Sequence, residues 1–279
     1  MEKLLIVDGS MLLFQSFYGM PKKILNKRGE SVEAVVCFLG ILFKEIRIIK
    51  PNKLLIVFDG ENKLERQQID ENYKANRKNF LNASQEDNPF PQLEIIKIVL
   101  KQLNFLYIET TTCEADDLIA SIVNDNKNIL NIVISSQDKD LFQLIDDNVS
   151  VFSYRGKVSV HWDKQTFFTK YGFEPKYFST YKALFGDKSD NISGIKGFGN
   201  VTTSKIIKSY GDIFDIYKNI NLVDTKLAKI LSENKQKVLK NFSLIELHSK
   251  SKIYSLPNCI FNFDSNMSSS KILKELDIL

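Results

Sequence analysis

The sequence predicts an α/β protein in which a central, mostly parallel sheet flanked by helices is followed by a helical region. Two observations lead to this prediction. Over roughly the first 150 residues, short aliphatic runs alternate with amphipathic stretches, as expected for parallel strands joined by helices. Beyond Tyr177 that alternation ends, and glycines interrupt a series of short helical segments. We therefore expect an α/β core over residues 1–175 and a helical region over residues 176–279.

The strands and helices of the core are recognised by their periodicity. Three apolar runs have the length and β-branched content of buried strands, namely Leu4–Val7, Leu54–Phe58 and Ile132–Ile134. A helix is predicted to begin at Ser31, a good N-cap followed by apolar residues at helical spacing, and to end before Pro51. Further helices are predicted over about residues 92–103 and 115–123.

Two stretches do not follow this pattern. Between residues 60 and 91 the apolar periodicity gives way to lysines and asparagines, and the stretch is too long for an ordinary loop. We expect a functional or disordered insertion there. Residues 222–279 are helical and lysine-rich to about residue 250, then serine-rich and asparagine-rich, and contain no interpretable motif.

Composition narrows the class of protein. With 43% hydrophobic and 26% charged residues, the chain can bury a large core. It contains no apolar run of the roughly 18 residues that a membrane span needs and no signal-like start, so a cytoplasmic protein without a membrane partner is expected. The three cysteines are too widely spaced for a disulfide framework or a zinc site. Separated lysine-rich and acidic stretches suit an anionic polymer, although an AT-rich genome explains the lysines equally well.

Acidic residues follow three of the predicted strands. Asp8 and Asp59 end the first two, and Asp138 and Asp140 follow the third. Because the carboxyl ends of parallel strands share one edge of the sheet, these side chains should converge. Two further sets should join them: Glu114, Asp116 and Asp117 at the start of a helix, and Asp187 and Asp190 in the glycine-rich part of the chain.

Converging carboxylates repel one another, and divalent cations would relieve this repulsion. Oxygen ligands without histidine favour Mg²⁺ or Mn²⁺, and two such ions about 4 Å apart suit the hydrolysis of a phosphodiester bond. Taken singly, each acid could be a helix cap, a first-turn residue or a turn residue. Their coincidence on one predicted edge favours the metal site.

The chain resembles the 5′-nuclease domain of bacterial DNA polymerase I, within the flap-endonuclease family. The resemblance runs in the family's order over residues 1 to 210 and is carried by Val7–Ser10, Val57–Asp59, Tyr73–Lys74 with Arg77, Glu114–Leu118, Asp138–Leu144 and Gly186–Gly199. It implies a PIN-like core with a helical arch and a SAM-like, helix-turn-helix-type helical region. It also implies one metal near Asp8, Asp59, Glu114 and Asp116, a second near Asp138, Asp140 and Asp190, and supporting roles for Asp117 and Asp187.

The same resemblance assigns DNA-binding parts. Residues 60–91 would be the arch that a single-stranded 5′ end threads, with Lys74 and Arg77 gripping phosphate and Tyr73 stacking on a base. Arg66 matches a further basic position of the family. A solvated basic loop is the alternative.

Residues 186–210 resemble the family's helix-turn-helix variant, which holds duplex DNA through backbone amides. The resemblance implies a potassium site on this turn, and loop flexibility is the alternative explanation of its glycines. The DNA-binding residues implied here are Gly194, Lys196, Gly197, Gly199, Thr202 and Lys205.

Gln15 departs from the family, which usually has a phosphate-contacting arginine at this position. A neutral amide loses the charge-assisted part of the contact, so either the affinity is lower or Lys22, Lys23 or Arg28 compensates.

The resemblance therefore implies a monomeric 5′-3′ exonuclease and 5′-flap endonuclease. Its DNA substrates would be flaps, nicked or gapped duplexes and RNA–DNA hybrids, as in primer removal during replication and repair. The alternative from another class is a protein that binds branched DNA without cutting it. A toxin-like ribonuclease should lack the insertion and the glycine turn. A phosphatase using Asp8 as nucleophile should have a second aspartate where Ser10 stands.

Overall fold

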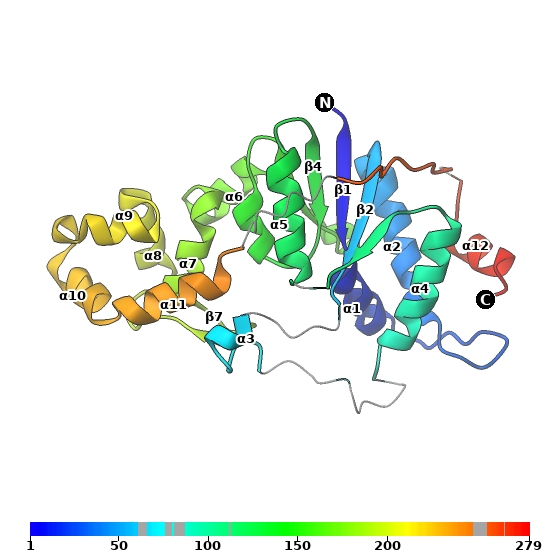
Figure 1. Ribbon diagram of the computed structural model, residues 1–279, viewed down its shortest axis with the longest axis horizontal. Helices are drawn as coiled ribbons and strands as arrows, with labels where there is room; N and C mark the ends of the chain where they lie inside the picture. The colour runs from blue at the N-terminus through cyan, green and yellow to red at the C-terminus, as the bar shows by residue number, and fades with distance from the viewer. Residues whose placement is uncertain (61–65, 76–79, 81–86, 112, 248–255, 265) are drawn as a thin grey trace.

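The computed structural model describes residues 1–60, 66–75, 80, 87–111, 113–247, 256–264 and 266–279. Its centre is a six-stranded sheet in the order β3-β2-β1-β4-β5-β6, in which five strands are parallel and β6 is antiparallel to β5 (Figure 1). The predicted mostly parallel sheet is therefore confirmed. The strands are β1 (Lys3–Asp8), β2 (Lys53–Phe58), β3 (Tyr107–Glu109), β4 (Asn131–Ser135), β5 (Val149–Ser153) and β6 (Val160–Trp162).

The strand order places a crevice at the carboxyl end of β1. The chain builds the sheet outwards from β1 through β2 to β3, and then returns to the other side of β1 with β4. Such a reversal leaves adjacent strand ends without a covering crossover, and ligands of open α/β sheets bind there. Asp8 is the last residue of β1 and lies at this crevice.

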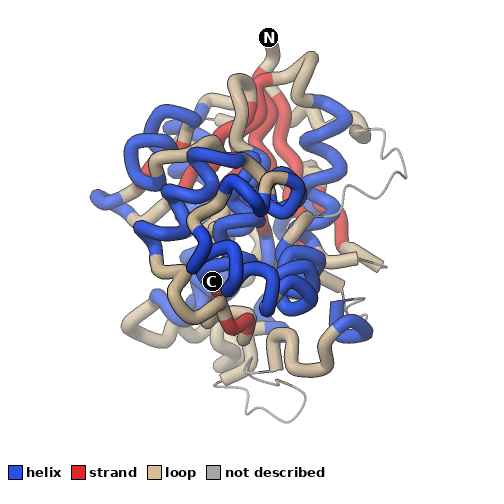
Figure 2. The backbone as a smooth tube through the Cα atoms, turned by 90° about the vertical axis from the view of Figure 1, so that its left-hand side faces the viewer, coloured by secondary structure: helices blue, strands red, loops and turns tan. Residues whose placement is uncertain are grey.

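Helices cover both faces of the sheet, as Figure 2 shows from a second direction. Alternate side chains of β1 enter different cores: Leu4 and Ile6 belong to one, and Leu5 and Val7 to the other. The second core is closed by α1 (Gly9–Gly19), α2 (Glu33–Ile49), α4 (Phe90–Gln102) and α12 (Ser269–Glu275). The first is closed by α5 (Ala115–Asn126), the 3₁₀ helix η1 (Asp140–Leu144), α6 (Lys164–Tyr171) and α7 (Phe178–Phe185).

The predicted start of the α2 helix was wrong. Ser31 forms an isolated bridge with Leu25, and Val32 precedes the helix without a side-chain cap. Gln92 of α4 caps it instead, because its Oε1 accepts from the amide nitrogens of Ala34 at 2.8 Å and Val35 at 3.4 Å. The helix ends before Pro51 as predicted.

The helical region packs onto the core rather than folding separately. It contains α8 (Asn200–Tyr210), α9 (Ile213–Lys218), α10 (Thr225–Glu233) and α11 (Lys235–Ile245), and short pairs of residues form β7 (Gly186–Asp187) and β8 (Ile192–Ser193). Buried side chains from α8, α9, α10 and α11 belong to the same apolar cluster as α5 and β1. Short helices α3 (Arg66–Ile69), η2 (Gly156–Val158), η3 (Pro175–Tyr177) and η4 (Ile220–Leu222) complete the described elements.

The C-terminal segment returns to the far side of the sheet. The Leu54 amide donates to Cys259 O at 2.9 Å, and Phe261 and Phe263 enter the second core. The segment ends in α12, which packs on α2 at the opposite end of the molecule from α9 and α10 (Figure 1). None of the helices in the described residues combines the length and apolar character that crossing a membrane requires.

Candidate active site

Three strands end in an acid at the predicted edge. Asp8 Oδ1 accepts from the Met11 amide at 2.9 Å and so caps α1, and its Oδ2 accepts from Ser136 Oγ at 2.8 Å. Asp59, after β2, accepts at 2.8 Å from the Ala115 amide at the start of α5. Asp138, after β4, accepts from the Asp140 amide at 2.9 Å. Each acid therefore has a capping or turn role and also faces the crevice edge.

Asp8 carries an unfavourable negative charge. Burial and, after it, the charges of Asp59 and Asp138 together raise its pKa to about 7, against hydrogen bonds from Met11 and Ser136 that lower it. The effect of the neighbouring charges shows that the three strand-end acids act on one another. A bound cation would favour the ionised form of Asp8.

The first acidic group consists of Glu114, Asp116 and Asp117, each of which offers an oxygen within 4.8 Å of the others. Arg66 from α3 lies among them. Its Nη1 and Nη2 donate to Asp117 at 3.0 and 2.7 Å, and Nη1 also contacts Glu114. Lys74 Nζ bonds the other Glu114 oxygen.

These two cations set the charge states of the first group. Burial would raise the pKa of Glu114, but Lys74 and Arg66 outweigh it and lower that pKa. Asp116 keeps a raised pKa because of burial and of the Glu114 charge, with Arg66 only 3.7 Å from its Oδ1. The group is thus compensated by positive charge but not fully.

The second acidic group consists of Asp140, Asp187 and Asp190, again with oxygens within 4.8 Å. Lys182 of α7, only 7% exposed, bonds both Asp140 and Asp187 through Nζ. Burial raises the pKa of Asp140 to about 7 against the opposing effect of Lys182. The pKa of Lys182 itself is raised, because the two aspartates outweigh its burial. The sequence-based prediction missed Lys182, although its being the only charged residue of Phe178–Phe185 was a usable signal.

The segment at residues 66–75 joins both acidic groups to the helical region. The Lys74 amide donates to Asp190 O at 3.1 Å, and Arg66 Nη2 donates to Glu246 O at 3.1 Å after α11. Lys240 of α11 pairs with Asp70 at 2.8 Å. Residues 66–75 of the 60–91 insertion are therefore held against the acidic groups and the helical region by these contacts.

This docking covers two of the predicted DNA-binding residues. Tyr73 is 3% and Arg66 4% exposed, and the Tyr73 hydroxyl donates to Glu114 at 3.5 Å. In this conformation neither side chain is accessible to a nucleotide. Arg77, and with it much of the predicted arch, lies outside the described residues.

The glycines of the 186–210 turn have different roles. Gly186, at φ 93°, and Gly194 lie against each other's backbone, and a Cβ on Gly194 would overlap the Phe185 carbonyl. Gly194 therefore permits close backbone packing. Gly199 precedes α8 with open space around it. The side chains of Lys196 and Lys205 are exposed, and Thr202 is half-buried.

A cleft of about 1020 Å³ adjoins the second acidic group. Its lining includes Asp138, Asp187 and Asp190 together with Lys182 and the exposed ring of Phe185. It combines acids, a buried cation and aromatic surface.

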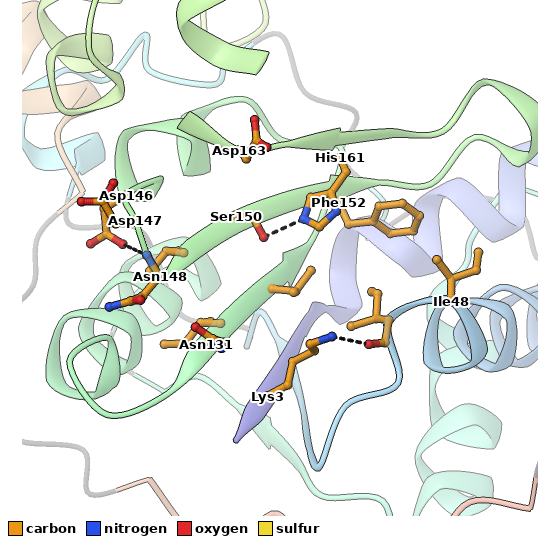
Figure 3. Close-up of a pocket in the computed structure, with 14 residues that line it drawn as sticks. Lys3, Ile48, Asn131, Asp146, Asp147, Asn148, Ser150, Phe152, His161 and Asp163 are labelled. Carbon is orange, nitrogen blue, oxygen red and sulfur yellow. Dashed lines mark hydrogen bonds between the residues drawn. The ribbon is translucent and has the colours of Figure 1, made fainter. Parts of the chain in front are cut away.

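A second pocket, of about 470 Å³, lies at the amino-terminal ends of β1 and β4 (Figure 3). Its charged groups are engaged locally: Lys3 Nζ donates to Ile49 O at 2.9 Å, and Asp147 pairs with Lys164 at 3.0 Å. Burial lowers the pKa of His161, whose Nε2 lies 2.7 Å from Ser150 Oγ. The acidic edge is therefore the better candidate site.

Gln15 is held by the β5–β6 hairpin. Its Nε2 donates to Tyr154 O at 2.8 Å, and Gln137 Nε2 donates to the same oxygen at 2.7 Å. Arg155 Nε in turn donates to Gln137 Oε1 at 2.6 Å. The cation adjoining Gln15 through this network is thus Arg155. The loop with Lys22, Lys23 and Arg28 extends towards α12, where Lys27 pairs with Asp277 (Figure 1).

Comparisons with known proteins agree with this architecture. Family models described as "5'-3' exonuclease, N-terminal resolvase-like domain" and "5'-3' exonuclease, C-terminal SAM fold" match residues 3–172 and 173–262. A 5'-3' exonuclease of Aquifex aeolicus is 32% identical over 89% of this chain and 83% of its own length. DNA polymerase I of Caldicellulosiruptor bescii is 34% identical over 84% of this chain, which spans only 27% of that relative.

Solved structures show the same fold. The T5 D15 protein co-crystallized with metal ions superposes with a TM-score of 0.74 at 22% identity, over 88% of this chain and 89% of that one. The catalytic core of Rad2 in complex with DNA substrate gives 0.59 at 15% identity, over 99% and 91%. The predicted PIN-like core with a SAM-like helical region is thereby confirmed. The chain belongs to the 5′-3′ exonuclease family.

Proposed function

We propose that this chain is a divalent-metal-dependent nuclease that removes 5′ ends and 5′ flaps from DNA. The observation that carries the proposal is the pair of carboxylate groups beside the crevice, each with oxygens within 4.8 Å. Membership of the 5′-3′ exonuclease family supports the reaction, and the T5 D15 flap endonuclease of the same fold was crystallised with DNA and metal ions.

The donor set fits hard cations. It contains only carboxylate oxygens, and burial raises the pKa of Asp8, Asp116 and Asp140, so bound cations would stabilise their ionised forms. We assign one Mg²⁺ or Mn²⁺ to Glu114 and Asp116 with Asp8 and Asp59. We assign the other to Asp140 and Asp190 with Asp138, and supporting roles to Asp117 and Asp187. When bound, the ions would supply the Lewis acidity that phosphodiester hydrolysis requires.

Arg66, Lys74 and Lys182 act as counter-cations before metal arrives. They contact the same oxygens that the ions would take, and like charges at such separations repel strongly. The metal-bound site therefore needs these side chains to turn from the carboxylates towards the phosphate. Movement of Arg66 is favoured because its Nε is buried and has no hydrogen-bond partner among the described residues.

DNA would contact several elements around this site. The exposed Lys196 and Lys205, with Gly197, Gly199 and Thr202, would hold the duplex by its phosphates, with K⁺ on the turn. The single strand would pass the 60–91 insertion, where Arg77 joins Lys74 and Tyr73 becomes accessible once residues 66–75 lift. Arg155 would supply the charge that Gln15 lacks. We further propose that the chain acts as a monomer and accepts RNA–DNA hybrids.

The decisive test is cleavage of an end-labelled 5′-flap duplex with Mg²⁺ or with chelator. Asp116→Ala and Asp140→Ala should lower turnover by roughly 100-fold or more while DNA binding is retained, because loss of a metal ligand removes charge stabilisation of the transition state. The matched control is Asp125→Ala, an exposed acid on the same helix as Asp116. Binding by the wild-type protein without any product in Mg²⁺ would instead favour the non-cutting alternative.

A further inference from the structure

Phe185 is an exposed aromatic ring at the last residue of α7, and it lines the cleft beside the second acidic group. The side chain is 47% exposed although phenylalanine is costly to hydrate. We propose that Phe185 is the platform on which an unpaired nucleobase of the substrate stacks, next to the phosphate that is cut. This inference rests on the proposed nuclease function and adds a base-binding subsite to it.

The ring is held rigidly by a stack of aromatic side chains. Tyr181 lies 5.2 Å from Phe185 between ring centroids with an interplanar angle of 20°, and Phe178 lies 5.6 Å from Tyr181 at 9°. Phe178 and Tyr181 are buried. Among the described residues no ring stacks on the other side of Phe185. The stack therefore ends in a fixed, solvent-facing ring, which a base can cover at little entropic cost.

The backbone beneath the ring is fixed as well. The Phe185 carbonyl lies so close to Gly194 that no Cβ would fit there, and the Ile195 amide donates to Leu184 O at 2.9 Å. The end of α7 is thus clamped by the glycine-rich turn. The position of Phe185 relative to the acidic group follows from this packing and not from a mobile loop.

The position of the ring beside the proposed metal site indicates that the ligand is a nucleotide. Lys182 lies one turn earlier on α7 and bonds Asp140 and Asp187 of the second acidic group. Under the proposed function that group holds a divalent cation, and a phosphate attracted to the cation would lie beside the aromatic stack. A nucleobase on that nucleotide offers a flat face to Phe185. Only an unpaired or terminal base has such a face free, and stacking tolerates every base. The site therefore favours DNA ends and flaps without favouring a sequence.

The matched control is Phe168, which is 45% exposed on α6 and does not line the cleft. Binding of a 5′-flap duplex is measured with Ca²⁺, a hard cation that suits the same carboxylates, and within the time before any product accumulates. Phe185→Ala should raise the Kd by about 10-fold, whereas Phe168→Ala should leave it unchanged. The salt dependence of binding should be the same for Phe185→Ala and wild type, because no charge is removed.

Further variants distinguish stacking of a base on the aromatic ring from apolar contact alone. Phe185→Leu should weaken binding as Phe185→Ala does, and Phe185→Trp should restore it. With 2-aminopurine in the flap next to the scissile phosphate, binding to wild type should change the fluorescence, and Phe185→Leu should abolish that change. Wild-type affinity in the leucine variant, or an equal loss in Phe168→Ala, would overturn the inference. Absence of wild-type cleavage in Mg²⁺ would instead contradict the proposed function, since the stacking measurements require no turnover.

Discussion

Lys182→Met removes the cation of the second acidic group while keeping a side chain of similar length. The ammonium bonds Asp140 and Asp187 and is buried, so the variant leaves three clustered carboxylates without it. Removing one partner of a buried ion pair typically costs about 3–5 kcal/mol of unfolding free energy. We expect a loss of this size in metal-free protein at pH 8.

The loss should shrink at low pH. The pKa of Asp140 in the folded protein is already about 7, well above its ordinary value, and without Lys182 it should rise further. A group whose pKa is higher in the folded protein than in the unfolded one stabilises the fold at pH values below its unfolded pKa. This stabilisation is lost as the pH rises through the folded pKa. At pH 5 the variant can protonate Asp140 and recover much of the lost stability.

Divalent metal should reverse the effect. If the second acidic group binds Mn²⁺, the variant no longer has an ammonium competing for the oxygens, and it should bind the ion more tightly than wild type. At a free ion concentration 100 times the Kd, the stabilisation is about 2.7 kcal/mol. The measurement is urea unfolding at pH 5 and pH 8, with chelator or with Mn²⁺.

Lys164→Met is the matched control, because Lys164 pairs with Asp147 on the surface near the opposite edge of the sheet. We expect no measurable change for it at either pH. Equal stabilisation of Lys182→Met and wild type by Mn²⁺ would refute the reasoning that the lysine and the metal share one set of oxygens.

Three further outcomes follow from the structure. Burial raises the pKa of Glu45 to about 7, against a hydrogen bond from the Ser135 hydroxyl that lowers it. Between pH 4.5 and 8, wild type should therefore lose about 3 kcal/mol of unfolding free energy relative to Glu45→Gln. A pH-independent difference in denaturant unfolding would contradict this. Arg155→Ala should reduce the slope of log Kd against log salt concentration by about one, because one phosphate contact is lost. Lys157→Ala on the same hairpin should leave this slope unchanged. Gly194→Ala should lower the melting temperature, because its Cβ has no room; unchanged melting would disprove the close packing.

The acidic edge could be predicted from the sequence because its geometry depends on strand order alone. Parallel pairing of β1 with β2 and β4 places the acids after those strands side by side, whatever the details of the loops. The cap of α2 could not be predicted in this way. Its acceptor is Gln92, from a helix 58 residues further on, whereas the local signal pointed to Ser31.

Long-range contacts also determine whether the side chains of Arg66 and Tyr73 are buried or exposed. Arg66 and Tyr73 belong to a lysine-rich and asparagine-rich stretch with no apolar period, for which a DNA-binding arch was expected and a solvated basic loop was the alternative. In the structure their side chains are buried, because the carboxylates of the first acidic group attract Arg66 and the apolar cluster accepts the Tyr73 ring. The family resemblance identified these residues but not which charge they contact before substrate arrives.

The distribution of cations across the acidic edge implies an order of events. Arg66 and Lys74 compensate the first group and Lys182 the second, but in the described residues no basic side chain forms an ion pair with Asp8, Asp59 or Asp138. These three acids lie at the strand ends, where burial and the charges of Asp59 and Asp138 raise the pKa of Asp8. A cation therefore gains most by approaching from the strand ends, where no basic side chain must first be displaced. Arg66 and Lys182 would leave the carboxylates afterwards, when phosphate offers them a replacement for the negative charge they give up.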